Sequence, residues 1–174
     1  MKIGIISDSH DNVDLFEKGI DFFNAQGVSL VLHAGDLVSP FTFTHLRKLK
    51  CPCVMIFGNN EGEKVALTRL AEEAGVSLNP GPYEYKFQNK DILLMHEPYT
   101  LRSASVSGCY DLVVYGHTHL PDVKTVKGCL VVNPGECCGY VTGEATLAVV
   151  ELQDMSVKIY SIPDFREKKI KEVF

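Results

Sequence analysis

Five times along this chain, a short apolar run ends directly in residues of the types that bind metal ions. The first run, Ile3 to Ile6, leads into Ser7-Asp8-Ser9-His10. In extended backbone, side chains two residues apart point to the same side, so Asp8 and His10 can converge just past the end of a strand. On its own this Asp-x-His pair is a weak signal, because Asp and His are ordinary turn residues. Its weight depends on how the other runs end.

The four later apolar runs, near 29–32, 53–57, 91–95 and 112–115, end in the same way. In chain order they lead to Asp36, Asn59, His96, His117 and His119. A glycine stands directly before three of these positions, at 35, 58 and 116, and lets the backbone come close to a central object. Turn preference explains any one of these residues, but gives no reason for a metal-binding type at every strand end. The pattern therefore predicts one shared metal site.

Between the early runs lie segments with helical spacing, near 12–27, 40–48 and 61–74. Alternating strands and helices joined by short loops indicate a largely parallel sheet, in which ligands bind outside the carboxyl ends of the strands. The second half is richer in strands: we expect them over 83–87, 91–95, 112–115, 123–126, 130–133, 145–152 and 157–162, with a helix near 100–107. The prediction is a single α/β (α+β) domain over 1–174, with two sheets packed face to face and helices outside.

Charge and composition limit the classes of binding partner that this chain can have. The formal net charge of −5 is a poor basis for gripping a nucleic-acid backbone or an anionic membrane, so no stable nucleic-acid binding is expected. The charge run at 166–169 is expected to be solvated. No apolar stretch approaches the length of a membrane span, and without a recognisable signal sequence we expect a cytoplasmic protein. The six cysteines lack the paired spacing of a structural zinc site and are expected to be free thiols.

The candidate ligands are too many for one ion. Their mixture of nitrogen and oxygen donors, without thiolate, suits Mn²⁺, Ni²⁺, Fe, Co²⁺ or Zn²⁺ better than Ca²⁺ or Mg²⁺. Two such ions about 3.5–4 Å apart, joined by a bridging carboxylate, are used to hydrolyse phosphate esters. They neutralise the phosphoryl oxygens and acidify a bridging water to hydroxide for in-line attack. An acidic protein could thus bind an anionic substrate through its metals.

The ordered set of Asp8-x-His10, Gly35-Asp36, Gly58-Asn59, His96 and Gly116-His117-Thr118-His119 resembles the calcineurin-like metallophosphoesterase superfamily. The small size and Asn133-Pro134-Gly135 resemble its YfcE-type and archaeal phosphodiesterase branch. The resemblance implies a four-layer αββα sandwich. It assigns Asp8, His10 and His119 to one metal, Asn59, His96 and His117 to a second, and Asp36 to both. Mn²⁺ is the first expectation for the ions, and small phosphodiesters are the implied substrates.

Two positions depart from the family pattern. Many relatives have a histidine directly after the ligand asparagine, where it protonates the leaving group; here that residue is Asn60. An amide can hydrogen-bond substrate but cannot protonate an alkoxide, which favours aryl esters and a diesterase. Glu97 and Pro98 follow His96 where many relatives have glycine, which predicts a narrower or charged rim. Together with Asn60, His33 is a candidate catalytic residue, with a supporting or packed position as its alternative.

Other functions stay open at this stage. The superfamily includes a retromer subunit of this size with weakened metal sites, so a non-catalytic protein-binding scaffold is the main alternative. All seven ligand positions are filled here, which favours the enzyme. A phosphomonoesterase and a metal- or nucleotide-binding regulator are further alternatives. The sequence is also compatible with a homo-oligomer.

Overall fold

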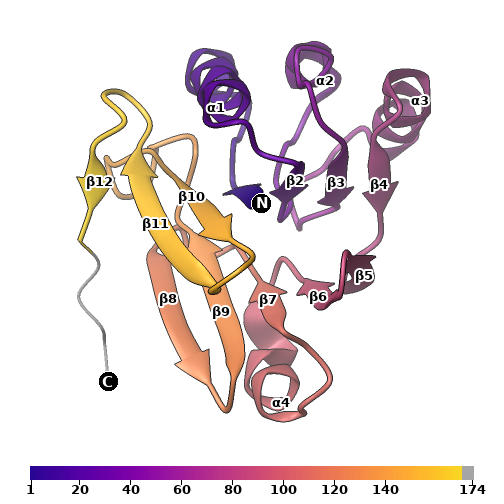
Figure 1. The fold of residues 1–174 in the computed structure, drawn as a ribbon. Helices are drawn as coiled ribbons and strands as arrows, with labels where there is room; N and C mark the ends of the chain where they lie inside the picture. Colours follow the sequence, from indigo (N-terminus) through magenta and orange to yellow (C-terminus); the bar gives the residue numbers. More distant parts are fainter. Residues whose placement is uncertain (170–174) are drawn as a thin grey trace.

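The computed structural model describes residues 1–169 and shows four layers, with two sheets between layers of helices (Figure 1). Helices α1 to α3 cover the outer face of the first sheet, and α4 covers the outer face of the second. Residues 170–174, part of the predicted single domain, lie outside the described residues. The two-sheet α/β architecture predicted from the sequence is confirmed.

The first sheet has seven strands in the order β12-β11-β10-β1-β2-β3-β4. Their bounds are β1 Lys2–Ile6, β2 Leu30–His33, β3 Cys53–Ile56, β4 Ser77–Asn79, β10 Thr146–Glu151, β11 Ser156–Ser161 and β12 Glu167–Lys168. Strands β1 to β4 are parallel, β10 pairs antiparallel with β1, and β11 pairs antiparallel with β10. The carboxyl ends of β1, β2 and β3 therefore lie side by side at one edge.

The second sheet has five strands in the order β5-β6-β7-β9-β8. Their bounds are β5 Tyr83–Phe87, β6 Lys90–Leu94, β7 Leu112–Val114, β8 Pro121–Val126 and β9 Cys129–Pro134. The central strands β6, β7 and β9 are parallel, and the outer strands β5 and β8 are antiparallel to their neighbours. The hairpin predicted around 127–128 is the β8–β9 pair.

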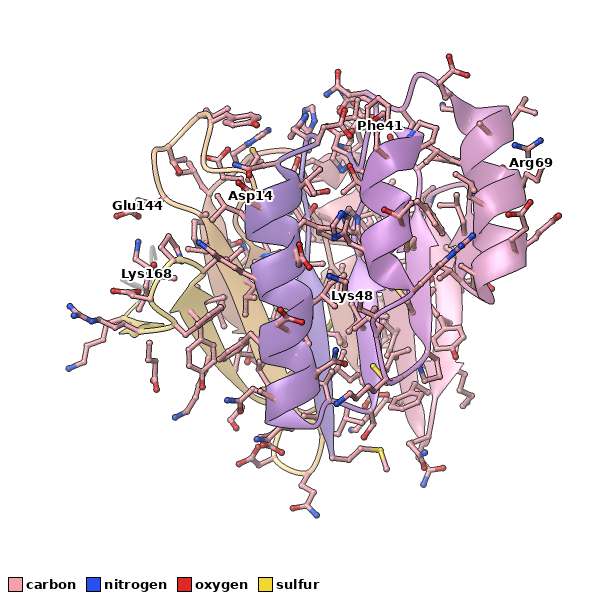
Figure 2. The ribbon with its side chains drawn as sticks, turned by 90° about the horizontal axis from the view of Figure 1, so that it is seen from above. Asp14, Phe41, Lys48, Arg69, Glu144 and Lys168 are labelled. Carbon is pink, nitrogen blue, oxygen red and sulfur yellow. The ribbon has the colours of Figure 1, made fainter. Side chains whose placement is uncertain are left out.

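The helices are α1 Val13–Gln26, α2 Pro40–Leu46, α3 Lys64–Ala74 and α4 Leu101–Val106, with a short 3-10 turn at Pro98–Thr100. In Figure 2, α1, α2 and α3 lie side by side over the first sheet, with Asp14 and Phe41 near the N-terminal ends of α1 and α2. Asn12 caps α1 through its side-chain oxygen, which accepts the N–H of Leu15, and Gly27 ends the helix in a left-handed conformation.

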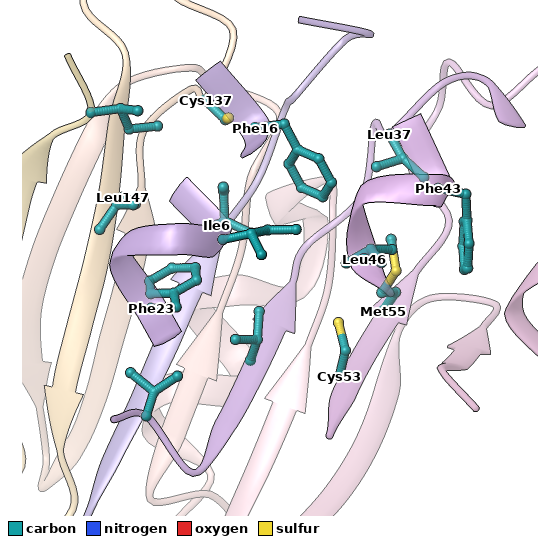
Figure 3. Packing of buried hydrophobic residues seen from close by; sticks show 14 of the residues in the cluster. Ile6, Phe16, Phe23, Leu37, Phe43, Leu46, Cys53, Met55, Cys137 and Leu147 are labelled. Carbon is teal, nitrogen blue, oxygen red and sulfur yellow. The ribbon is translucent and has the colours of Figure 1, made fainter. Parts of the chain in front are cut away.

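Side-chain alternation along β1 separates two of the cores. Ile3 and Ile5 face the second sheet and are fully buried in the layer between the sheets. Ile6 faces the helices, where it packs with Phe16 and Phe23 (Figure 3). A third core lies between the second sheet and α4 and includes Tyr115. Three apolar interfaces thus hold four layers in register and fix the strand ends that carry the candidate ligands.

Two strands were not predicted. The segment Ser77–Asn79 pairs in parallel with β3, although its polar residues give no strand pattern. Glu167–Lys168 pairs with β11 at the far edge of the same sheet, so the expectation of a purely solvated charge run was incomplete. Its charges are typical of an exposed edge strand, where they discourage pairing with another chain, and Glu167 accepts from Lys158 at 2.9 Å. Only the pairing partner, which sequence does not reveal, makes these segments strands.

All six cysteines are free, as predicted; four are buried, Cys51 is half-buried and Cys109 is exposed. Within residues 1–169, no helix combines the length and apolar character needed to cross a membrane.

Candidate metal centre

The predicted ligands come together where the carboxyl ends of the two sheets meet. Asp8 and His10 follow β1, Asp36 follows β2, and Asn59 follows β3. His96 follows β6, and His117 and His119 follow β7. The loops after β1 and β2 are tied together by backbone hydrogen bonds, from the Asp8 N–H to the Gly35 carbonyl at 3.0 Å and from the His10 N–H to the Asp36 carbonyl at 3.1 Å. All seven predicted ligands lie in this one cluster.

Five of the seven predicted ligands have a left-handed backbone conformation. The φ angles are 52° at Asp8, 39° at His10, 59° at Asp36, 65° at His117 and 61° at His119. Such angles occur in only a few per cent of non-glycine residues, with Asp, Asn and His tolerating them best. Residues held in such sparsely populated regions cluster at functional sites. Here the left-handed turns direct several ligands from one loop toward a common point.

The three predicted glycines do allow close approach. A Cβ built on Gly58 would lie 2.1 Å from Asp36 Oδ1, and one on Gly116 would lie 2.2 Å from Ser7 Oγ and 2.7 Å from Asp8 Oδ2. Any larger residue at these two positions would collide with the cluster. The glycines therefore match the interpretation made from sequence.

One half of the cluster consists of Asp8, His10 and His119, hereafter the carboxylate half. Asp8 Oδ1 lies 3.8 Å from His10 Nε2 and 3.6 Å from His119 Nε2. The two imidazole rings are stacked with centroids 5.2 Å apart. Asp8 is fully buried and accepts the His117 N–H. These three side chains are close enough to share one ion.

The other half consists of Asn59, His96 and His117, hereafter the amide half. Asn59 Oδ1 lies 2.9 Å from His96 Nε2 and 2.9 Å from His117 Nδ1. His96 Nδ1 lies 2.8 Å from the Ala34 carbonyl, which can only accept, so this nitrogen carries a proton. In the neutral ring, His96 Nε2 then presents a lone pair to the amide oxygen. Two acceptors at this distance are stable only with a cation or a proton between them.

Asp36 lies between the two halves. Its Oδ2 is 3.4 Å from His10 Nε2 and 3.3 Å from His96 Nε2. Burial opposes the ionisation of Asp36, but the neighbouring His96 and the hydrogen bonds from Asn60 outweigh burial and hold the pKa of Asp36 well below its usual range. Asp36 is therefore a carboxylate, and it faces one histidine of each half.

Of the two candidate catalytic residues, Asn60 lies at the cluster and His33 lies beneath it. Asn60 is exposed, and it donates to Asp36 from its backbone N–H at 2.9 Å and from its side chain at 2.7 Å. His33 is completely buried, accepts the Gly35 N–H at Nδ1 and lies 3.2 Å from Ser9 Oγ. Burial lowers the pKa of His33 to about 4, so the ring is neutral. The structure places it as a support of the loops after β1 and β2, not on the open face of the cluster.

Sequence reasoning missed two buried glutamates. Glu136 Oε2 lies 2.8 Å from His119 Nδ1, and its other oxygen accepts the Thr142 N–H and hydroxyl. Burial opposes its ionisation, but these hydrogen bonds lower its pKa to about 2. Glu61 bridges two loops, accepting the Leu37 N–H at 3.0 Å and the Gly58 N–H at 2.7 Å. Glu136 follows β9 after one glycine, as closely as Asp8 follows β1, so the strand-end pattern could have revealed it. Glu61 lies farther from the end of β3, and that pattern gives no signal for it.

The residues fit a divalent metal. His10 Nε2 is buried and makes no hydrogen bond within the described chain, yet it faces oxygens of both Asp8 and Asp36. Buried polar atoms are rarely left unpaired, and each such atom calls for an explanation. Metal-binding histidines typically donate their second ring nitrogen to a carboxylate or carbonyl. His119 and His96 have such partners in Glu136 and the Ala34 carbonyl.

Comparison with known proteins agrees with this geometry. Residues 1–155 match the model of the calcineurin-like phosphoesterase superfamily domain. The chain is 35% identical over 156 residues to phosphodiesterase MJ0936 of Methanocaldococcus jannaschii, covering 88% of this chain and 94% of that one. It is 30% identical over 139 residues to a probable metallophosphoesterase of Methanothermobacter thermautotrophicus, covering 78% of this chain and 76% of that one.

Solved structures show the same fold. An archaeal protein described as a novel phosphodiesterase superposes with a TM-score of 0.88 at 34% identity, covering 92% of this chain and 99% of that one. The phosphoesterase YfcE of E. coli gives a TM-score of 0.70 at 18% identity over 96% of both chains. Vps29 of Entamoeba histolytica gives 0.70 at 23% identity, covering 97% of this chain and 96% of that one. The last two likenesses concern the fold alone.

Proposed function

Because the chain belongs to the calcineurin-like phosphoesterase superfamily, we propose that it is a metal-dependent phosphodiesterase that hydrolyses small phosphodiesters. Asp8, His10 and His119 would hold one ion, Asn59, His96 and His117 a second, and Asp36 both. The observation that carries this proposal is the position of Asp36 Oδ2, nearly equidistant from His10 Nε2 and His96 Nε2 at 3.4 and 3.3 Å. An oxygen placed between one histidine of each half is suited to bridging.

The nitrogen and oxygen donors favour Mn²⁺, with Ni²⁺, Fe, Co²⁺ or Zn²⁺ as alternatives. Bound ions of this kind would neutralise the charge on the phosphoryl oxygens and lower the pKa of a water that attacks phosphorus. The positive charge of the ions is needed to attract an anionic substrate, because the chain itself has a formal net charge of −5. Cys138 Sγ lies 3.1 Å from Glu136 Oε2, and Cys138, Glu136 and His119 are close enough together to form a further group that could hold a metal.

Asn60 shapes the chemistry of the leaving group. With both its backbone and side-chain N–H groups on Asp36, it fixes the orientation of the bridging carboxylate. It has no proton to give at neutral pH, so an alkoxide must leave without direct help from this position. We therefore expect diesters with acidic aryl leaving groups to be cleaved much faster than dialkyl esters.

The test is release of p-nitrophenol from bis(p-nitrophenyl) phosphate by protein stripped of metal and reloaded with Mn²⁺. The Asp36→Asn substitution keeps the side-chain shape and removes the shared charge. It should lower kcat/KM about 1,000-fold, since metal stabilisation of the transition state amounts to several kcal/mol.

The matched control is Asp11→Asn in the neighbouring loop. Asp11 Oδ1 accepts from Ser39 and Thr42, contacts that an amide oxygen can keep, so activity should change less than about threefold. If the protein binds two ions but hydrolyses no substrate with any of the five metals, this result would contradict the proposal and favour a non-catalytic scaffold. Equal losses in both variants would contradict the role of Asp36.

A further inference from the structure

A cavity of about 420 Å³ opens beside the amide half; His96 of that half lines it, and so does Gly58, the residue before Asn59. This volume falls within the range of roughly 300–1,000 Å³ that is usual for small-molecule sites. We propose that it binds the aromatic ring of an ester group, as in an aryl or nucleoside phosphodiester, while the phosphate lies at the metal ligands. This inference rests on the proposed function and specifies its substrate class.

The walls of the cavity favour a flat apolar group. Phe57, Pro80, Pro82 and Met95 contribute apolar surface, and Tyr99 stands at the rim with 82% of its surface exposed. A phenol ring left in water forgoes the large gain that aromatic side chains make on burial. A second flat ring stacked against Tyr99 would recover part of that gain. Ring stacking is tolerant of sequence or substituent, so the walls select a class of group rather than one compound.

The charges at the cavity favour a neutral group over a second phosphate. Lys64 Nζ lies 5.4 Å from the centroid of the Phe57 ring, within reach of a cation–π contact. Glu97, which also lines the cavity, offsets the charge of this cation, and its Oε1 accepts the Tyr99 hydroxyl at 2.7 Å. One cation and one anion give no net attraction for an anion. The second carboxylate oxygen of Glu97 can accept a hydrogen bond from an amino group on a ring.

The shared residues place the ring and the phosphate next to each other. His96 Nε2 faces Asn59 and Asp36, while the same residue lines the cavity. A phosphate near these atoms would therefore carry its ester group directly toward Phe57 and Tyr99. At the other end of the cluster, Glu136 anchors the loop of Val141 and Thr142 against His119.

The proposal is tested by calorimetric binding of phenylphosphonate and methylphosphonate to Mn²⁺-loaded protein, which needs no turnover. Phenylphosphonate should bind at least about tenfold more tightly. Tyr99→Ala should reduce that ratio to below about threefold while leaving methylphosphonate binding unchanged. The matched control is Tyr140→Ala, which removes another exposed tyrosine, 65% exposed, from the loop on the Glu136 side; the ratio should remain.

A second pair of probes distinguishes the two sources of the ring. Adenosine 5'-monophosphate bound more tightly than ribose 5-phosphate, with the gain lost in Tyr99→Ala, would assign the cavity to nucleoside esters. If phenylphosphonate binds more tightly than methylphosphonate but adenosine 5'-monophosphate binds no more tightly than ribose 5-phosphate, the cavity would be assigned to simple aryl esters. Equal binding of phenyl- and methylphosphonate in the unchanged protein would overturn the inference even if bis(p-nitrophenyl) phosphate is hydrolysed. If binding depends on the ring but no ester is hydrolysed, the proposed function would be contradicted, whereas the inference that the cavity binds a ring would stand.

Discussion

The two halves of the candidate metal centre are built differently. The carboxylate half has its own buried carboxylate in Asp8, and its His119 is held by a second one, Glu136. The amide half has only the neutral Asn59, and its His96 is held by the Ala34 carbonyl. Asn59 is also exposed, and the substrate-sized cavity opens on this side. Only Asp36 gives both halves a shared negative charge.

This difference indicates that the two halves differ in how strongly they bind an ion. Anionic ligands in a buried setting attract a divalent ion more strongly than a neutral amide at the surface. We infer that the carboxylate half retains its ion, while the amide half binds its ion more weakly and stays accessible to the substrate. Substitutions of single residues in each half test this difference.

The largest expected effect comes from Asp8→Ala. It removes the only unshared carboxylate among the predicted ligands, so the ion of the carboxylate half should be lost and kcat/KM should fall about 1,000-fold. The fold should survive, because the three apolar cores do not depend on this side chain. Metal content by mass spectrometry and far-UV circular dichroism provide the measurement. Two ions bound normally by this variant would contradict the assignment of Asp8.

Glu136→Gln should weaken metal binding at the carboxylate half about 10- to 100-fold, the usual effect of removing a carboxylate that supports a histidine ligand. With its pKa near 2, Glu136 remains ionised at every practical assay pH, so the loss should not vary between about pH 6 and 9. The matched control is Glu61→Gln, since Glu61 supports the loops after β2 and β3 without contacting His119. If both variants lose the same ion equally, Glu136 acts only by holding the fold.

Asn60→His should add a proton donor at the amide half and raise the hydrolysis of alkyl esters about tenfold, below the full contribution of an evolved general acid. Aryl esters, which leave without a proton, should gain little. Rates with a series of leaving groups of different pKa measure the effect directly. An unchanged dependence on leaving-group pKa would show that residue 60 does not face the leaving oxygen.

The smallest effect concerns the unchanged protein. Titration of metal-free protein with Mn²⁺ should resolve two dissociation constants that differ by about tenfold or more, equivalent to about 1.4 kcal/mol. In His117→Ala the weaker ion should disappear and the tighter one should remain. Loss of the tighter ion in this variant would reverse the assignment of the two halves.

The sequence by itself determined most of the strands, the four helices and the seven candidate ligands, because each candidate follows an apolar run closely enough for local pattern to find it. Tertiary structure alone decided what supports those ligands. Glu136 reaches His119, and Asn60 turns onto Asp36, because loops from different strands meet at one edge. His33, whose sequence position resembles that of a ligand, is turned into the core between Ser9 and Gly35. The short strands β4 and β12 and the cavity beside His96 likewise exist only through neighbours distant in sequence, which no local pattern encodes.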